Sequence, residues 1–150
     1  MPEIKACIFD ASGVLIDDVN TVFNIFNKTL EHFKINPVTF EDFQSRTKIP
    51  YWEFYKSFGL SEKDGKSTDQ FFKDFYPLFA SDVELYPEVK DILSQLKARG
   101  IKLGIVTHLP RDVISKHLHE FGIRNYFDVI VTFDDTDEHK PSPKPLIIAL

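Results

Sequence analysis

Apolar side chains recur at helical spacing in the first half of the chain, at Val22, Phe23, Phe26, Leu30 and Phe33. This spacing predicts an amphipathic helix over 18–34, which ends before Asn36-Pro37 because the residue before a proline avoids helical geometry. Shorter helices are predicted over 39–46, 51–58 and 68–79, with a turn at Asp64-Gly65 before the last of them. Eleven of the fifteen phenylalanines fall in this part of the chain, which predicts a small helical bundle with its own packing.

The segments on either side of this bundle show short apolar runs instead of helical periodicity. Three runs, over 4–9, 101–106 and 127–132, have the length and character of strands buried on both faces. Helices are predicted before the second and third runs, over 87–99 and 110–121, and each is followed by a glycine. This alternation predicts an α/β fold with a parallel sheet, interrupted after its first strand by the helical insert.

Polar residues that can carry chemistry stand at the ends of the predicted strands. Asp10 ends the first run and leads into Gly13, Thr107 ends the second, and Lys140 follows the third in a proline-containing loop. In open parallel sheets, ligands bind beyond the carboxyl ends of the strands. Taken singly, these residues are more often caps, structural residues or solvated loop residues. Together, a nucleophilic carboxylate, a hydroxyl and a lysine predict a site for phosphoryl transfer.

Composition narrows the class of protein. The chain has 150 residues, 43% of them hydrophobic, and a formal net charge of −5, which suits a globular domain rather than a disordered chain. The acidic balance argues against nucleic acid as a partner, and no apolar run is long enough for a membrane span. Cys7 is the only cysteine, so no internal disulfide can form, which predicts a cytoplasmic location. Neither the composition nor the net charge predicts an oligomeric state.

The ordered motifs resemble those of the haloacid dehalogenase (HAD) superfamily of hydrolases. The matching stretches are IKACIFDASGVL at 4–15, GIVT at 104–107 and KPSP at 140–143. The stretches YPEV at 86–89 and GIKLG at 100–104 resemble the subgroup with a helical cap, which includes the phosphoglycolate phosphatases. The resemblance extends over nearly the whole chain.

This resemblance implies a three-layer, Rossmann-like parallel-sheet core formed by 1–16 and 85–150, with an inserted α-helical cap over 17–84. Related caps reach down to the substrate near the position that Arg46 and Lys48 occupy between two predicted helices. The two side chains are therefore candidates for recognising a substrate carboxylate or a second phosphate. A solvated helix end explains the same residues without any such role.

The resemblance also assigns roles at the strand ends. Asp10 would attack a phosphoryl group and become an aspartyl phosphate, while Lys140 would steady the nucleophile and the transferring group. Thr107 would bind a phosphate oxygen, and the main-chain amide of His108 would face the same phosphate. Mg²⁺ would be held by the Asp10 carboxylate, the main-chain carbonyl of Ser12 and an acid from a fourth motif. The predicted protein is a Mg²⁺-dependent hydrolase of a small phosphate monoester.

Ser12 departs from the family pattern, because phosphatases of this family usually carry a second aspartate at that place. That aspartate protonates the leaving group and then activates water, whereas a serine hydroxyl cannot do so near neutral pH. Losing such acid–base help typically costs about 10²–10⁴ in rate. We therefore expect a slow phosphatase that favours good leaving groups such as aryl or acyl phosphates. Two alternatives stay open: a haloacid dehalogenase, and a weak or silent member that binds a phosphorylated metabolite or a protein partner.

The fourth motif of the family, a Gly-Asp turn with a further acid, does not occur up to residue 150. Without the strand that carries this motif, the first strand at 4–9 would form a bare apolar edge. We expect either a fragment of a longer protein or a partner that covers this edge, and we favour the fragment. On this expectation the magnesium site is incomplete.

Overall fold

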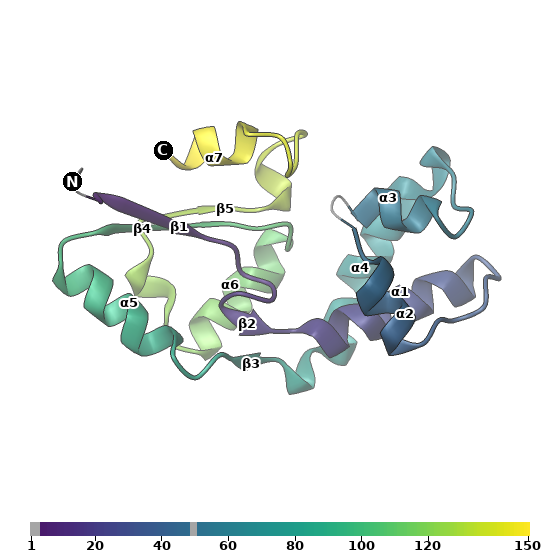
Figure 1. Cartoon of the computed structure of the whole chain (residues 1–150), viewed down its shortest axis with the longest axis horizontal. Coiled ribbons are helices and arrows are strands. Elements are labelled where there is room, and N and C mark those ends of the chain that lie inside the picture. Colours follow the sequence, from purple (N-terminus) through teal and green to yellow (C-terminus); the bar gives the residue numbers. More distant parts are fainter. Residues whose placement is uncertain (1–3, 49–50) are drawn as a thin grey trace. The chain divides into compact units, whose positions relative to one another are not determined.

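A computed structural model describes residues 4–48 and 51–150 (Figure 1). Its contacts divide the chain into two compact units, Met1–Asp17 with Glu84–Leu150 and, between them, Asp18–Val83. We call the first the α/β unit and the second the helical unit. Each boundary lies one residue from the position predicted from the sequence.

The α/β unit is built on a three-stranded parallel sheet. Its strands are β1 (Ala6–Phe9), β4 (Lys102–Val106) and β5 (Val129–Val131), with β4 in the middle. Both strand pairs are parallel, with Cys7 opposite Leu103 on one side of β4. The predicted α/β class with a parallel sheet is confirmed.

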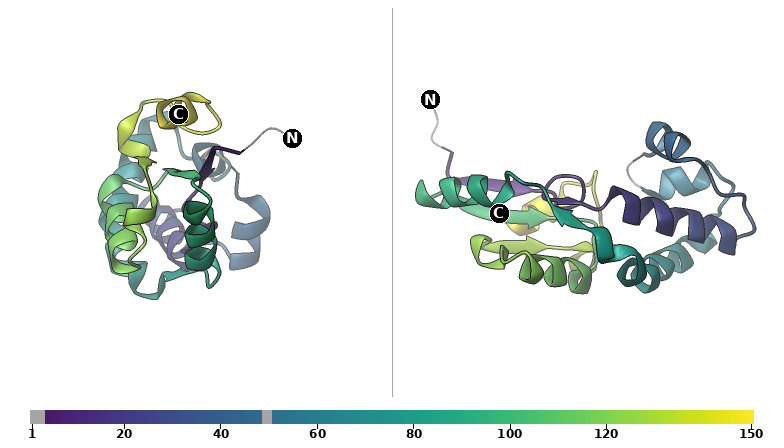
Figure 2. Two further views of the ribbon diagram at one scale, coloured as in Figure 1. Left: turned by 90° about the vertical axis from the view of Figure 1, so that its left-hand side faces the viewer. Right: turned by 90° about the horizontal axis from the view of Figure 1, so that it is seen from below.

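Helices cover both faces of this sheet. In Figures 1 and 2, α5 (Val89–Ala98) and α6 (Arg111–Glu120) lie over one face, and α7 (Lys144–Ala149) lies over the other. α7 contacts both β4 and β5, and α5 contacts β4. The core between these layers contains fully buried aliphatic side chains, among them Leu93, Leu103, Ile105, Ile114, Leu118 and Ile123. The three-layer arrangement follows from this burial, because each helix covers an apolar face of the sheet.

The strands differ in burial according to their place in the sheet. β4 is buried from Leu103 to Val106, whereas β1 is partly exposed because it lies at an edge. The prediction that 4–9 is buried on both faces is therefore wrong for the described residues, whereas the edge position of β1 agrees with the expectation of an apolar edge at 4–9. Gly104 allows the close approach of β4 to its neighbour, since a Cβ at this position would lie 2.9 Å from a side-chain carbon of Val129.

A second, two-stranded sheet lies where the chain leaves and re-enters the α/β unit. β2 (Ile16–Asp17) and β3 (Glu84–Leu85) pair antiparallel, with Ile16 opposite Leu85. Nothing in the sequence pattern predicts these strands, because two residues carry no measurable periodicity. The pairing places the segment that leaves the α/β unit next to the segment that re-enters it.

Among its described residues, the helical unit contains four α-helices, α1 (Val19–His32), α2 (Phe40–Arg46), α3 (Tyr51–Lys56) and α4 (Gly65–Phe79). Helices α1 and α4 pack against each other. Aromatic side chains dominate the core, where Phe26 stacks on Phe54 with ring centroids 4.5 Å apart. In the part of the chain that the structure describes, no helix is both long and apolar enough to cross a membrane.

Among the helix ends that differ from their predicted positions, two have clear local causes. α1 ends at His32 because Lys34 adopts a left-handed conformation, with φ of 59°, and Ile35 donates back to the carbonyl of Leu30. α4 begins at Gly65 rather than at 68. The Asp64 carboxylate accepts hydrogen bonds from the main chain and hydroxyl of Ser61, both at 2.7 Å, and this short turn leads directly into the helix.

Candidate active site

Asp10 lies directly after β1, at the carboxyl edge of the sheet, and two donors hold its carboxylate. Its Oδ1 accepts from the main-chain N–H of Ala11 at 2.8 Å, and its Oδ2 accepts from Lys140 Nζ at 2.6 Å. Lys140 Nζ also donates to the carbonyl of Val106, at the end of β4, at 3.2 Å. The Asp10 and Lys140 side chains are 35% and 22% exposed, so neither group of the pair is fully buried. The structure thus brings together the predicted nucleophile and the predicted lysine.

Thr107 and His108 lie directly after β4, at the same edge of the sheet. Thr107 is buried, and its Oγ1 accepts from the main-chain N–H of Leu109 at 3.1 Å, which leaves the hydroxyl proton to be donated. Among the described residues, no hydrogen bond occupies the main-chain N–H of His108. Both groups are donors of the kind that hold a phosphate oxygen.

The imidazole of His108 is neutral at pH 7. Burial, followed by the positive charge of Lys140, lowers the pKa of His108 to about 4, although Asp10 acts in the opposite direction. Its Nε2 is buried and has no hydrogen-bond partner within the described ranges. The ring therefore adds no positive charge to the site, and the sequence assigned it no role.

Ser12 lies in a tight turn that folds the chain back after β1. The Ala11 carbonyl accepts from the main-chain N–H of Ile16 at 3.1 Å, and the N–H of Gly13 donates to the Ile16 carbonyl at 2.9 Å. Gly13 has φ of 71°, a conformation that favours glycine. Ser12 itself is half-buried and forms a bridge with Ile16. The turn therefore places a hydroxyl, and no carboxylate, two residues after Asp10.

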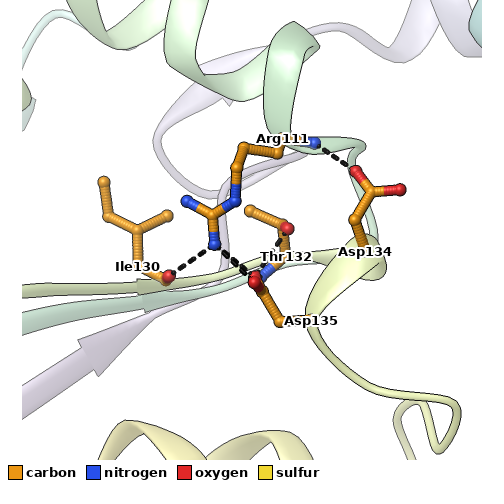
Figure 3. A network of polar contacts seen from close by, with 5 residues as sticks. All are labelled: Arg111, Ile130, Thr132, Asp134 and Asp135. Carbon is orange, nitrogen blue, oxygen red and sulfur yellow. Dashed lines mark hydrogen bonds and ion pairs between the residues drawn. The ribbon is translucent and has the colours of Figure 1, made fainter.

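Charged groups anchor the segment that follows β5 (Figure 3). Arg111 Nη2 donates to the carboxylate of Asp135, at 2.6 and 2.5 Å, and to the carbonyl of Ile130 at 3.4 Å. The main-chain N–H of Arg111 donates to Asp134 Oδ2 at 2.8 Å, while the N–H and hydroxyl of Thr132 donate to Asp135 at 2.7 Å. Burial raises the pKa of Asp135, but these hydrogen bonds outweigh it, so the pKa is lowered overall. Asp135 therefore stays ionised and holds the 3₁₀ turn Phe133–Asp135 (η4) to the start of α6.

Rings also meet near the lysine, an arrangement that sequence reasoning missed. The ring of His139 stacks on Phe133, with centroids 4.1 Å apart, and meets the ring of His108 edge-on at 6.0 Å. The only signal in the sequence is that His139 directly precedes Lys140.

Arg46 and Lys48 belong to the helical unit. Arg46 ends α2, where its guanidinium carbon lies 4.2 Å from the centroid of the Phe58 ring and Nη2 donates to Ser57 Oγ at 3.4 Å. Lys48 follows α2 and is exposed. Their suggested part in substrate recognition stays a prediction.

The oxygen donors at Asp10 and Ser12 suit a hard cation. Mg²⁺ commonly uses one or two carboxylates together with water and substrate phosphate oxygens, rather than a complete cage of protein ligands. Asp10 offers a carboxylate at the sheet edge, and Ser12 offers a main-chain carbonyl in the turn. Within residues 4–48 and 51–150, no group of three or more His, Cys, Asp or Glu side chains could hold a metal ion. Asp10 and Ser12 would therefore supply two of the ligands, and the acid of the fourth motif stays an expectation.

Known proteins resemble this chain along nearly its whole length. The pyrophosphatase PpaX of Bacillus pumilus (strain SAFR-032) is 32% identical over 155 residues, which cover 98% of this chain and 68% of the relative. Among solved structures, CbbY from Rhodobacter sphaeroides, determined in complex with phosphate, superimposes with a TM-score of 0.77 at 22% identity, covering 99% of this chain and 72% of CbbY. A predicted phosphoglycolate phosphatase from Haemophilus somnus 129PT gives a TM-score of 0.75 at 24% identity, covering 99% of this chain and 71% of that protein.

The match to a family model includes the residues at the sheet edge. A model of haloacid dehalogenase-like hydrolases matches 7–150, a range that contains Asp10, Thr107 and Lys140. The solved structures under 25% identity share the fold, a parallel sheet with helices, that positions these residues. The chain belongs to the haloacid dehalogenase-like hydrolase family.

Proposed function

We propose that this protein hydrolyses phosphate from small phosphorylated molecules, with Asp10 as the nucleophile. The observation that carries the proposal is the pairing of Asp10 with Lys140 at 2.6 Å, beside Thr107, at the carboxyl edge of the sheet. Carboxylate, hydroxyl and ammonium are the groups that phosphoryl transfer requires. The match to PpaX, which is named a pyrophosphatase, supports the same class of reaction.

In the first step an oxygen of Asp10 forms a bond to phosphorus while the bond from phosphorus to the leaving group breaks. The Ala11 N–H and Lys140 Nζ orient the carboxylate before the reaction, so little reorganisation is needed. Lys140 then offsets part of the negative charge that moves onto the transferring group. In the second step water attacks the phosphorus of the aspartyl phosphate, which releases inorganic phosphate and restores the Asp10 carboxylate.

Thr107 and His108 supply the donors for the phosphate oxygens. The Thr107 hydroxyl can donate its proton to a phosphate oxygen. The main-chain N–H of His108 can do the same, because no described group accepts a hydrogen bond from it. Mg²⁺, when bound by the Asp10 carboxylate and the Ser12 carbonyl, would neutralise charge on the phosphoryl group.

Ser12 restricts the substrates to those with good leaving groups. The serine hydroxyl cannot protonate an alkoxide as it departs, so alkyl phosphates are expected to react slowly. A phosphate leaving from pyrophosphate, a carboxylate leaving from an acyl phosphate and a phenolate all depart without that proton. We therefore infer that phosphoanhydrides and aryl or acyl phosphates are the preferred substrate class. We also propose a cytoplasmic location for the protein.

The two alternatives from the sequence differ in their support. A haloacid dehalogenase is not favoured, because the related proteins are named pyrophosphatase and phosphoglycolate phosphatase. A silent member that binds a phosphorylated molecule without turnover is favoured by one observation, the hydroxyl of Ser12 in place of a carboxylate.

The test is hydrolysis of pyrophosphate and p-nitrophenyl phosphate by the purified protein, with and without Mg²⁺, beside Asp10→Asn. We expect Mg²⁺-dependent phosphate release from both compounds, and at least a hundred-fold loss in Asp10→Asn, which keeps the shape of the side chain but removes the nucleophile. Phosphate binding without turnover would support the silent alternative. Release that persists in Asp10→Asn would contradict the mechanism.

A further inference from the structure

Lys140 is held at a defined place although its own segment is irregular. It lies between η4 and α7, and its side chain has four rotatable carbon–carbon bonds, which make a fixed position entropically costly. Its Nζ nevertheless donates to both Asp10 and the carbonyl of Val106. The main chain at Lys140 must therefore be placed by the neighbouring residues.

The ring of His139, directly before Lys140, supplies such a placement. It lies nearly parallel to the ring of Phe133, with an interplanar angle of 12° and centroids 4.1 Å apart. Its edge-on contact with His108 adds a second attachment, at an angle of 83°. Because His108 follows β4 and Phe133 follows β5, His139 attaches the lysine segment to the ends of two strands.

Phe133 is itself held firmly, so it can serve as a platform. Its main-chain N–H donates to the Leu109 carbonyl at 3.3 Å. Thr132 and Asp135 close the turn around it through a reciprocal capping arrangement, and Arg111 holds Asp135 (Figure 3). The stack therefore connects Lys140 to an anchored part of the sheet edge.

We propose that His139 is a positioning residue, whose ring stacks on Phe133 and thereby aims Lys140 at Asp10. The inference deepens the proposed phosphatase activity and rests on it. We assign packing to this ring because the two contacts that carry the argument are ring contacts, with Phe133 and with His108. An aromatic residue without an ionisable nitrogen should then keep Lys140 in position, whereas a side chain without a ring should not.

The first experiment compares His139→Phe, His139→Leu and His139→Ala in kcat and KM for p-nitrophenyl phosphate. Misplacing a catalytic group by about 1 Å can cost on the order of a hundred-fold in rate. We expect His139→Ala and His139→Leu to lower kcat at least ten-fold with a smaller change in KM, and His139→Phe to stay within about three-fold of the wild type. Loss in His139→Phe equal to that in His139→Ala would overturn the proposal.

The second experiment measures the position of Lys140 without using activity. Acetylation of lysines by an N-hydroxysuccinimide ester, followed by mass spectrometry, gives the reaction rate of Lys140 and of the exposed Lys144 in the same molecule. Lys140 should react more slowly than Lys144 in the wild type and in His139→Phe, because its Nζ is engaged. In His139→Ala its rate should rise at least three-fold, while the rate of Lys144 stays constant.

These measurements separate the two proposals. If the wild type hydrolyses none of the substrates, the proposed function fails, and Lys140 acetylation still decides the role of His139. If Lys140 reacts equally in all variants, the positioning role is wrong even where phosphatase activity is found. Circular dichroism identifies any variant that does not fold, and His139→Leu replaces His139→Ala in that case because it keeps apolar volume.

Discussion

At the scale of single residues, the site depends on which groups are held before a substrate arrives. The Asp10 carboxylate receives one hydrogen bond from its own turn and one from Lys140, so both of its oxygens have fixed directions. By contrast, the side chain of Ser12 provides a hydroxyl and no carboxylate in the same turn. The proposed nucleophile is thus oriented, while the side chain at position 12 offers the leaving group no acidic proton. This difference predicts how the protein discriminates between substrates.

Ser12→Asp should raise turnover of an alkyl phosphate such as glycerol 3-phosphate by about 10²–10⁴, because the new carboxyl group can protonate the leaving alkoxide. Turnover of pyrophosphate should gain less, because its leaving group needs no proton and only the attack of water on the aspartyl phosphate is helped by the new carboxylate. Steady-state phosphate release measures both rates. Ser12→Asn is the matched control, since it has a similar shape and no acidic proton. Equal gains in Ser12→Asp and Ser12→Asn would contradict the general-acid argument.

At the scale of elements, helices and strands could be predicted where apolar residues form a pattern along the chain. Features that depend on contacts between distant residues could not be predicted. The strands carrying Asp10 and Thr107 were predicted because uninterrupted apolar runs are typical of parallel strands. The contact of His139 with Phe133 could not be predicted, because the place of Phe133 depends on the hydrogen bonds that Asp135 accepts from Arg111 and Thr132. The apolar run at 4–9 overestimated the burial of β1, whereas the position of this strand at an edge was expected from the family resemblance.

The carboxylate of Asp128 connects two elements of the α/β unit, β4 and α5. Its carboxylate accepts from the main-chain N–H of Leu103 in β4 at 2.9 Å and from Lys97 of α5 at 3.0 Å. The hydrogen bond from Leu103, followed by that from Lys97, lowers the pKa of Asp128 to about 2. A carboxyl group whose pKa is lowered by folding stabilises the folded state above its ordinary pKa of 3.8, and this contribution is lost as the pH falls toward 2.

Asp128→Asn should therefore lower the free energy of unfolding at pH 7 and reduce its dependence on pH between about 4 and 2. Urea unfolding followed by circular dichroism at several pH values measures both effects. Asp137→Asn, which changes an exposed acid in the same unit, is the matched control. An identical pH dependence in Asp128→Asn and the wild type would show that the ionised carboxylate does not contribute.

At the scale of the whole molecule, the chain contains two separate cores of different character. The α/β unit is packed mainly with aliphatic residues such as Leu93 and Ile105, which are completely buried. The helical unit is packed with stacked aromatic rings, among them Phe26 and Phe54. Each core can therefore be weakened by a substitution that leaves the other intact.

Phe54→Ala should destabilise the helical unit by about 3–5 kcal/mol, the usual range for removing a buried phenylalanine. Hydrogen exchange measured by mass spectrometry should then rise in 18–83 and stay constant in β1, β4 and β5. Leu93→Ala should produce the reverse pattern, since this side chain belongs to the α/β unit. A uniform rise in either variant would mean that the two units unfold as one cooperative body.

The pairing of Asp10 with Lys140 has a consequence for the order in which the protein is made. The two residues are 130 positions apart, so Asp10 leaves the ribosome long before its partner exists. At a synthesis rate of roughly 5–20 residues per second, this interval is on the order of ten seconds. During that time the helical segment, whose contacts are local in sequence, can already fold. A nascent chain thus carries the proposed nucleophile from the start, but the Asp10 carboxylate lacks its lysine partner until the segment after β5 has been made and has reached the sheet.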